Sequence, residues 1–571
     1  MAVAVLHAAL VLPNHADRIT PLALARVPVE AIGIALLLLL ARDRRLRGLA
    51  PVAGVLVAVA VILKIADIAA FQAFARPFNP VLDLHLLGAA MNLLAGAVGA
   101  VGAYAIAVGA ALSAVAVLFA STWAVGRAGD LARSPPRRAA VSGVAVALAA
   151  WSGLWLAGVE TAPRMKAAAF ESALALYRHG AATTAALGDL AAFEAVASVD
   201  GWRDTPGERL FGGLRGKDVI VAFVESYGRT VIDDPRYAPA VTAVLEDGAR
   251  RLAEAGVAAR SGFLTSPTVG GMSWLAHGTA LSGLWVDNQR RYDSLMVSDR
   301  MTLNRAFRSA GWRTVALMPA ITMAWPEGAF YGYDRIYAAA DLGYRGKPFN
   351  WVTMPDQYTW SALRALELDA PSRQPFGRPP VVGQPFGRPP VMAEIALISS
   401  HAPWTPIPRL IPWDRVGDGR AFDAMAAEGD PPNVVWRDPE RVRLQFRLSI
   451  EYALETLVSY AETFDMENTV IVVLGDHQPA PLVTGEDAGR DVPIHILSGD
   501  SAVLAAVSGW GWTDGLLPAP DAPVWPMDAL RDRMIEAFSP ALHPAAAEAE
   551  AEVGTLLPAI GNPTDASPLF R

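Results

Sequence analysis

The sequence predicts a membrane protein with two parts: an N-terminal bundle of transmembrane helices and a C-terminal α/β domain with a mostly parallel central sheet. Hydrophobic residues make up 53% of the 571 residues and charged residues only 18%, which is too apolar for a wholly soluble enzyme. The apolar excess lies in the first 160 residues. From Lys217 onward, short β-branched runs alternate with helical stretches, as in sheets covered by helices.

Length and composition limit the classes of function. A chain of 571 residues is too long for one hydrophobic core, so two or more folding units are expected. The formal charge of −8 and the lack of a Lys/Arg-rich patch argue against a nucleic-acid-binding protein. The chain contains no cysteine, which excludes disulfides, thiolate metal sites and a cysteine nucleophile.

About five transmembrane spans are predicted. A short apolar stretch, 1–13, lacks the positive start of a signal peptide and is interpreted as the first span. The other four are long enough to cross a hydrocarbon core: 21–41, 50–72, 99–125 and 139–158. Residues 84–97 are amphipathic and are expected at the membrane interface.

Basic loops predict the orientation, because cytoplasmic loops carry an excess of Lys and Arg. Two arginine clusters follow the second and fourth spans: Arg42, Arg44, Arg45 and Arg47, and then Arg127, Arg133, Arg137 and Arg138. With both clusters inside, everything after residue 160 lies outside. The chain is therefore expected to be a multi-pass protein of the plasma membrane with an extracytoplasmic C-terminal domain.

Four regions are expected along the chain: a bundle over 1–160, a helical linker over 161–215, a catalytic domain over 216–545 and a tail over 546–571. Within the catalytic domain the pattern predicts buried strands at 218–225, 313–318, 393–399, 469–474 and 491–497, and helices at 439–465 and 527–538. Two nearly identical Pro-rich segments, 374–382 and 384–392, are predicted to form a lengthened surface loop.

Polar residues follow several of these strands. Glu225 ends one apolar run, Asp476 and His477 end another, and His401 follows a third. Ser273 follows a Gly-Gly turn at the start of a predicted helix. Because sites in such sheets lie beyond the carboxyl ends of the strands, we expect these side chains to meet.

The residue types in this set indicate metal chemistry. Two carboxylates, an imidazole and a hydroxyl oxygen suit a Zn or Mn ion. A metal would lower the pKa of the Ser273 hydroxyl, making it a stronger nucleophile, and would neutralise charge on an ester oxygen. A helix N-terminus at Ser273 would add backbone donors for an anion.

At these residues the chain resembles the sulfatase-like branch of the alkaline phosphatase superfamily, whose membrane-bound members include lipoteichoic acid synthases and phosphoethanolamine transferases. In the strand VIVAFVES, Glu225 matches the family's first metal-binding acid. Asp476 and His477 match its late Asp-His ligand pair. His401, in SSHAPW, matches a histidine that contacts the substrate phosphate.

The resemblance places the nucleophile at Ser273. Transferase relatives use Thr at this place, so Thr268 is the second candidate and Thr279 the third. Leu275 and His277 stand where sulfatases have the proline and arginine that are needed for formylglycine formation. These departures disfavour a true sulfatase and favour an unmodified serine that is transiently phosphorylated.

Further substrate contacts are implied by the resemblance alone. Trp325, Tyr331 and Asp334 lie where lipoteichoic acid synthases place a headgroup-binding segment, and Asp356 lies near an acidic turn of the family. Aromatic packing is the competing interpretation. His495 alternates within a strand and is expected to be structural.

The implied function is a metal-dependent transferase that uses Mn, Zn or Mg. It would move a phosphoglycerol- or phosphoethanolamine-type headgroup from a membrane phospholipid to a glycan or lipid hydroxyl through a covalent Ser or Thr intermediate. A phosphate- or sulfate-ester hydrolase and a non-catalytic membrane sensor or scaffold are the alternatives. Lys64 and Asp67, three residues apart in the third span, are expected to pair or to line the bundle interior.

Overall fold

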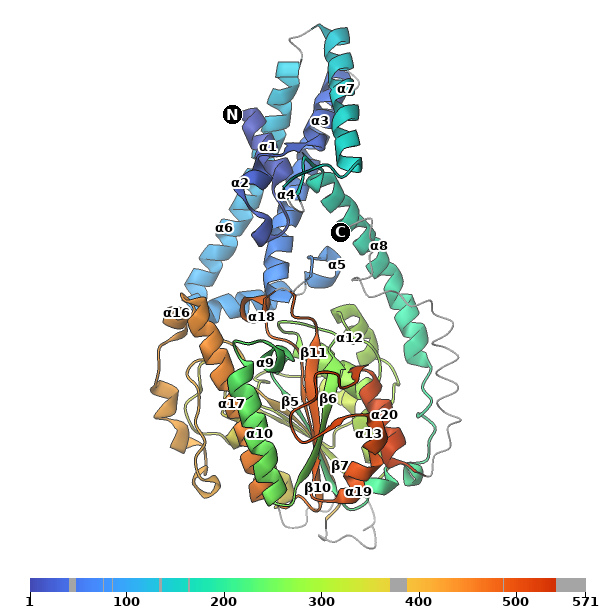
Figure 1. Ribbon diagram of the computed structural model, residues 1–571, viewed down its shortest axis with the longest axis vertical. Helices are drawn as coiled ribbons and strands as arrows, with labels where there is room; N and C mark the ends of the chain where they lie inside the picture. The colour runs from blue at the N-terminus through green and yellow to red at the C-terminus, as the bar shows by residue number, and fades with distance from the viewer. Residues whose placement is uncertain are drawn as a thin grey trace. The chain divides into compact units, whose positions relative to one another are not determined.

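The computed structural model describes residues 1–40, 48–74, 76–84, 86–132, 136–162, 165–369, 388–485 and 487–540. The chain forms two compact units, Met1–Asp189 and Leu190–Arg571, and their boundary falls within helix α8 (Glu171–Ser198) (Figure 1). Several predicted features lie outside the described residues: Arg42, Arg44, Arg45, Arg47, Arg133, the Pro-rich segment 374–382 and the tail 546–571.

Among its described residues, the first unit contains three helices that are long and apolar enough to cross a membrane: α4 (Leu49–Phe74), the segment Val98–Leu131 of α6, and Arg138–Leu156 of α7. They coincide with three of the predicted spans. The predicted spans 1–13 and 21–41 instead correspond to the shorter apolar helices α1 (Ala2–Val11) and α3 (Val29–Leu40). The predicted count of five is therefore not confirmed.

Helix α6 (Leu86–Ala132) changes direction at Gly99, which has a left-handed φ of 78°. The break separates the predicted interfacial segment 84–97 from the long apolar part of the helix. Helix α4 packs along α6, and α3 packs along α7 (Arg137–Leu156) (Figure 1).

Lys64 and Asp67 are buried in the first unit, at 0% and 2% exposure. The Lys64 ammonium donates to the carbonyl of Leu10, 3.0 Å away at the end of α1, and to the Ser172 hydroxyl at 2.7 Å. Asp67 lies 3.2 Å from the His179 ring nitrogen Nε2. Each residue thus joins α4 to the first turns of α8, so both line the interior of the unit.

In the part of the chain that the structure describes, the second unit is built on a nine-stranded sheet with the order β12-β6-β11-β10-β5-β9-β7-β8, and β13 also pairs with β6. The strands are β5 (Asp218–Val224), β6 (Ala258–Thr265), β7 (Arg313–Met318), β8 (Arg335–Ala338), β9 (Val391–Leu397), β10 (Thr469–Gly475), β11 (Asp491–Ser498), β12 (Thr513–Asp514) and β13 (Val524–Pro526).

The sheet is mixed. Strands β10, β5, β9, β7 and β8 are parallel to their neighbours in this block. Strand β11 is antiparallel to both β10 and β6, and β12 is antiparallel to β6. The expectation of a mostly parallel sheet is therefore not confirmed, although the parallel block contains four of the five predicted strands.

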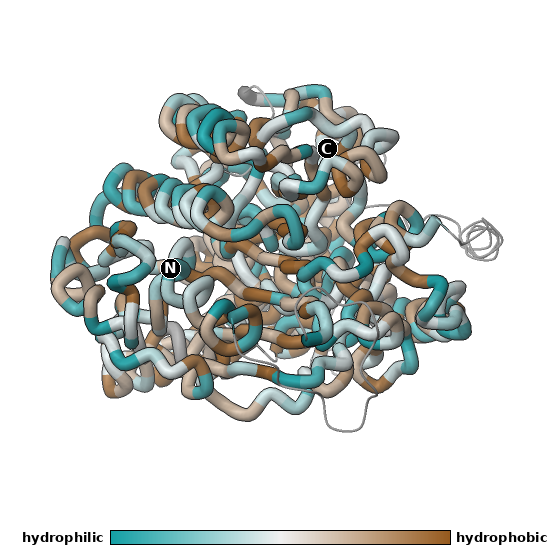
Figure 2. Tube along the Cα trace, turned by 90° about the horizontal axis from the view of Figure 1, so that it is seen from below, coloured by the Kyte–Doolittle hydropathy of each residue, from teal (hydrophilic) through white to brown (hydrophobic). Residues whose placement is uncertain are grey.

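Helices cover both faces of this sheet (Figure 1). On one face Ile220, Ala222 and Val224 pack against α10 (Ala238–Glu254), α15 (Asp356–Leu363) and α17 (Pro439–Thr463). The other face carries Phe223 and meets α11 (Ser273–Ser282) and α13 (Leu303–Ser309). Hydrophobic segments gather toward the middle of the unit, and hydrophilic ones lie mainly around them (Figure 2).

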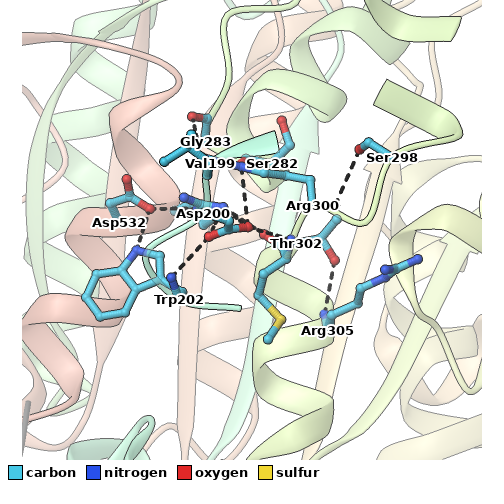
Figure 3. Close-up of polar contacts among 12 residues, drawn as sticks. Val199, Asp200, Trp202, Ser282, Gly283, Ser298, Arg300, Thr302, Arg305 and Asp532 are labelled. Atoms are coloured by element: carbon cyan, nitrogen blue, oxygen red, sulfur yellow. Dashed lines mark hydrogen bonds and ion pairs between the residues drawn. The ribbon is translucent and has the colours of Figure 1, made fainter. Parts of the chain in front are cut away.

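A buried ion network holds the C-terminal end of α11 (Figure 3). The Asp200 carboxylate lies 3.4 Å from the Arg531 guanidinium and 3.5 Å from that of Arg300. Arg300 also donates to the carbonyls of Ser282 and Gly283, at 2.9 and 3.2 Å. Because Arg531 belongs to α20 (Ala529–Phe538), the network joins the chain entering the unit to its last described helix.

Replacing Gly283 with alanine should destabilise the second unit strongly. Gly283 has a φ of +66°, and a Cβ atom there would lie 2.6 Å from Arg531 Nε. The left-handed backbone alone costs about 1–2 kcal/mol for a non-glycine residue, and the displaced arginine is fully buried and held by Asp200. Thermal unfolding of the full-length chain measures the effect.

Gly256 provides the matched control. Its φ of +77° is similar, but a Cβ atom would meet nothing within 4 Å. Gly256→Ala should therefore show only the backbone cost. Equal losses of stability in the two variants would contradict a role for the ion network.

Candidate active site

Three neighbouring parallel strands bring the predicted site residues together at one edge of the sheet. In β5 and β10, Val224 is paired with Gly475, so Glu225 and Asp476 follow side by side. Strand β9 flanks β5 on its other side, where Leu397 is paired with Val224. The Ser400 hydroxyl donates to the Glu225 carbonyl, which fixes the loop that carries His401.

Gly475 permits a close approach at this edge. A Cβ atom at this position would lie 1.9 Å from the carbonyl oxygen of Tyr227. The backbone of β10 can therefore approach the turn after Glu225 only because residue 475 has no side chain. The Asp476 carboxylate then accepts a hydrogen bond from the Ser226 amide at 2.8 Å.

Ser273 is the first residue of α11 and is brought to the cluster by the loop before it. The amide of Gly270 donates to the Gln478 carbonyl at 2.8 Å, which ties this loop to the segment after His477. Met272, directly before Ser273, has a left-handed φ of 63°, as does Ser226 after Glu225, with a φ of 58°. Strained backbone of this kind gathers at functional sites.

The side chains meet closely. The Ser273 hydroxyl donates to Glu225 Oε2 at 3.0 Å and lies 3.2 Å from His477 Nε2. His477 Nε2 is 3.3 Å from Glu225 Oε1 and 3.7 Å from Asp476 Oδ2. Glu225, Asp476 and His477 each offer a ligand atom within 4.8 Å of the others. Two carboxylates and an imidazole at this spacing fit a divalent metal ion.

The electrostatics of the cluster reflect its burial and its crowded charges. Burial raises the pKa of Glu225, but the charge and hydrogen bond of His477 outweigh it and hold the pKa well below its usual value. Burial, with the charge of Glu225, raises the pKa of Asp476 to about 6. Burial lowers the pKa of His477, yet the charges of Asp476 and Glu225 raise it to about 9 overall.

Metal affinity should therefore increase as the pH rises from about 6 toward 9. In the metal-free chain His477 keeps its proton up to a pKa of about 9, and a ligating imidazole must lose that proton. Titration calorimetry with Mn²⁺ at pH 7.5, in two buffers of different ionisation enthalpy, should show release of about one proton. Binding that is independent of pH and releases no proton would contradict this assignment of His477.

His401 lies on the loop that follows β9. Its amide donates to the Ile398 carbonyl at 3.0 Å, and its ring nitrogen Nδ1 contacts the carbonyl of Ala402. The ring is half-buried. His401 thus follows β9, the strand that flanks β5 on the side away from β10.

The two alternative nucleophiles are engaged elsewhere. Thr268 is buried, and its hydroxyl donates to the Gly271 carbonyl at 2.7 Å. Thr279 is also buried, and its hydroxyl donates to the Leu275 carbonyl at 2.8 Å. Of the three candidate hydroxyls, the structure brings that of Ser273 to the carboxylates.

The residues predicted from the resemblance to contact the headgroup lie in two places. The rings of Trp325 and Tyr331 pack in a tilted arrangement with centroids 5.8 Å apart. Asp334 bonds to the Thr314 amide at 3.0 Å and to Arg308 at 2.9 Å. Asp356 is fully buried and exchanges hydrogen bonds with Ser399. Burial raises the pKa of Asp356 to about 6. These contacts favour supporting roles for Asp334 and Asp356.

His495 is buried, and both of its ring nitrogens are engaged, by Tyr227 at 3.0 Å and by Ser261 at 2.7 Å. Burial lowers its pKa to about 3. A neutral histidine satisfied on both sides agrees with the expected structural role.

One pair near the site was not predicted. His277 Nδ1 lies 2.7 Å from Oε1 of Glu394, which is 1% exposed in the middle of β9. Asn304 donates to the other oxygen at 3.3 Å, and the Tyr333 hydroxyl also donates to it. The signal in the sequence was the lone acid in the apolar strand VMAEIAL, because a buried charge needs partners.

Comparisons with known proteins give matches among solved structures only, since no family model and no curated protein matches the chain. The lipoteichoic acid synthase LtaP from Listeria monocytogenes is 14% identical over 50% of this chain and 66% of its own, with a TM-score of 0.33. The match thus spans just under two thirds of the LtaP chain.

Two further structures match at the same TM-score of 0.33. The phosphoglycerol transferase GacH from Streptococcus pyogenes, in complex with sn-glycerol-1-phosphate, is 11% identical over 61% of this chain and 91% of its own. The periplasmic domain of the phosphoethanolamine transferase EptC from Campylobacter jejuni is 11% identical over 58% and 92%. All three are members of the alkaline phosphatase superfamily, which the sequence motifs resemble.

Proposed function

We propose that this chain is a membrane-anchored, metal-dependent phosphotransferase that moves a phosphoglycerol- or phosphoethanolamine-type headgroup from a phospholipid to a glycan or lipid hydroxyl. The observation that carries the proposal is the position of the Ser273 hydroxyl, 3.0 Å from Glu225 and 3.2 Å from His477. A hydroxyl at the start of a helix, beside a set of metal-ligating side chains, is placed to attack a phosphorus atom.

Glu225, Asp476 and His477 would hold a divalent ion such as Mn, Zn or Mg. When bound, the ion would lower the pKa of the Ser273 hydroxyl and neutralise charge on an ester oxygen. The donor set supports this because its ligand atoms lie within 4.8 Å of one another and come from rigid strand ends.

The transfer proceeds in two halves. The Ser273 hydroxyl gives its proton to a neighbouring base, Oγ attacks the headgroup phosphorus so that the Oγ–P bond forms, and the bond from phosphorus to the diacylglycerol oxygen breaks. His401, on the loop after β9, donates a proton to that oxygen. In the second half an acceptor hydroxyl gives its proton to His401 and attacks the phosphorus, the Oγ–P bond breaks, and Ser273 Oγ takes its proton back from the same base.

The membrane unit supports a lipid donor. Its three long apolar helices would keep the catalytic unit at a leaflet where phospholipids are abundant. The arginine clusters around the second and fourth predicted spans favour an extracytoplasmic position for the catalytic unit at the plasma membrane. Trp325, half-buried and packed against Tyr331, is the aromatic side chain proposed to contact the headgroup.

Product analysis tests the proposal. The full-length chain with Mn²⁺ is incubated in vesicles that contain phosphatidylglycerol or phosphatidylethanolamine, with and without a glycan acceptor. We expect diacylglycerol in amounts that match the headgroup phosphate attached to the acceptor. Free headgroup phosphate in the presence of acceptor would identify a hydrolase instead. A chain that binds metal but releases no diacylglycerol would favour the sensor or scaffold.

A further inference from the structure

Beneath the nucleophile lies a histidine–carboxylate pair that the transfer described above does not use. His277 is on the same helix as Ser273, four residues further on, and its Nδ1 lies 2.7 Å from Oε1 of Glu394. Residues four apart lie on the same face of a helix. Helical side chains also lean toward the N-terminus of the helix, which puts His277 on the Ser273 side of its own turn. Among the described residues, the Ser273 hydroxyl bonds to Glu225 and His477 and makes no hydrogen bond to His277.

Two contacts fix how α11 lies on the sheet. At its first residue, Ser273 meets Glu225. One turn later the His277 ring stacks on Phe223, with centroids 3.8 Å apart. Phe223 and Glu225 are two residues apart, roughly 6.6 Å along a strand and on the same face, and four helical residues rise about 6 Å. The spacing of Ser273 and His277 along the helix therefore matches the spacing of Glu225 and Phe223 along the strand, and His277 lies one helical turn after the nucleophile.

The hydrogen bonds around Glu394 determine which ring nitrogen of His277 carries the hydrogen. Glu394 is 1% exposed, and its oxygens accept hydrogen bonds from His277, Asn304 and Tyr333. Three donors suit an ionised carboxylate, which can only accept. Nδ1 of His277 therefore carries a hydrogen, and Nε2 is left as the basic nitrogen.

The remaining nitrogen is available. Within the part of the chain that the structure describes, His277 Nε2 has no hydrogen-bond partner, and the His277 side chain is 12% exposed. Glu225 and His477 also lie next to Ser273, but their lone pairs are assigned to the metal, so neither is taken as the base. In an in-line displacement the proton of the nucleophile is removed on the side opposite the leaving group, so His401 does not serve this purpose.

We propose that His277, oriented by Glu394, is the general base for Ser273, so that Ser273, His277 and Glu394 act as a serine–histidine–carboxylate triad. The inference rests on the proposed function. As Oγ attacks phosphorus, the Oγ–H bond breaks and its proton moves to Nε2, while Nδ1–H stays bonded to Glu394. When the Oγ–P bond breaks in the second half, Oγ takes the same proton back. Glu394 is a positioning residue, because it acts through His277.

The test distinguishes the role of His277 Nε2 from that of Nδ1. His277→Asn keeps a donor near the position of Nδ1 and removes Nε2. In single-turnover release of diacylglycerol from the phospholipid donor, we expect this variant to be about 10²–10⁴-fold slower, the range for loss of a general base, with little change in KM. Glu394→Gln keeps the size of the side chain and should lower kcat by at least about 10-fold.

Chemical rescue by imidazole is a second measurement, and it should have no effect if His277 is only structural. Added imidazole should replace the missing base. The rate of diacylglycerol release by His277→Ala, measured relative to that of wild type in the same imidazole, should therefore rise by at least about 10-fold. A His277→Asn rate within about 3-fold of wild type would overturn the triad. So would a His277→Ala variant that folds but whose activity is not rescued by imidazole. If His277→Ala does not fold, His277→Asn decides. Wild type that releases no diacylglycerol would instead overturn the proposed function, and the triad with it.

Discussion

Replacing Ser273 with alanine should lower headgroup transfer by at least about 10³-fold, as expected when a covalent nucleophile is lost. Alanine removes only the hydroxyl that lies 3.0 Å from Glu225 and leaves the three metal-ligating side chains in place. The variant should therefore bind metal while it forms no covalent intermediate. Diacylglycerol release and metal content, measured on the same preparation, report the two properties separately.

Thr268→Val is the matched control for this experiment. Thr268 is the alternative nucleophile, and its hydroxyl donates to the Gly271 carbonyl at 2.7 Å. Removal of that hydrogen bond costs about 1 kcal/mol of stability, so most of the transfer activity should remain. If Thr268→Val abolished transfer while Ser273→Ala kept it, the nucleophile would have to be reassigned.

Replacing Glu225 with glutamine should remove the bound metal and, with it, the activity. Glutamine has nearly the same volume but no charge, so two anionic ligands are reduced to one. Loss of a residue that only supports a metal ligand typically costs 10–100-fold in affinity or activity, and loss of a ligand itself should cost more than about 100-fold. Metal content after dialysis, measured by elemental analysis, is the readout.

Glu246→Gln makes the same chemical change on the exposed surface of α10 and should retain wild-type metal content. Thermal unfolding of both variants in the presence of chelator separates loss of metal from loss of fold. A Glu225→Gln chain that kept its metal and its activity would contradict the proposed metal site.

The fold was predictable where it depends on local pattern. Apolar runs that end in a polar residue marked β5 and β10, and their parallel pairing brings Glu225 beside Asp476. The direction of β11 was not predictable, because a buried strand has the same composition whether its neighbour is parallel or antiparallel. The helices α1 and α3 are shorter than their apolar segments, since hydropathy records composition and does not fix where a helix ends.

The parts of the site that were missed depend on long-range contacts. The lone acid at 394 was visible, but its partner His277 is 117 residues away in the sequence. Asp200 and Arg531, which hold the end of the nucleophile helix, are separated by 331 residues. No periodicity or spacing connects residues so far apart, and only the folded sheet brings them together.

Covalent transfer through Ser273 can be tested by trapping the intermediate. The full-length chain with Mn²⁺ is incubated with donor phospholipid in the absence of acceptor, quenched in acid and digested for mass spectrometry. The proposed mechanism predicts that the peptide containing Ser273 gains the mass of the phospho-headgroup, and that added acceptor removes it. Diacylglycerol release at the wild-type rate without modification of Ser273, or modification at Thr268, would contradict it.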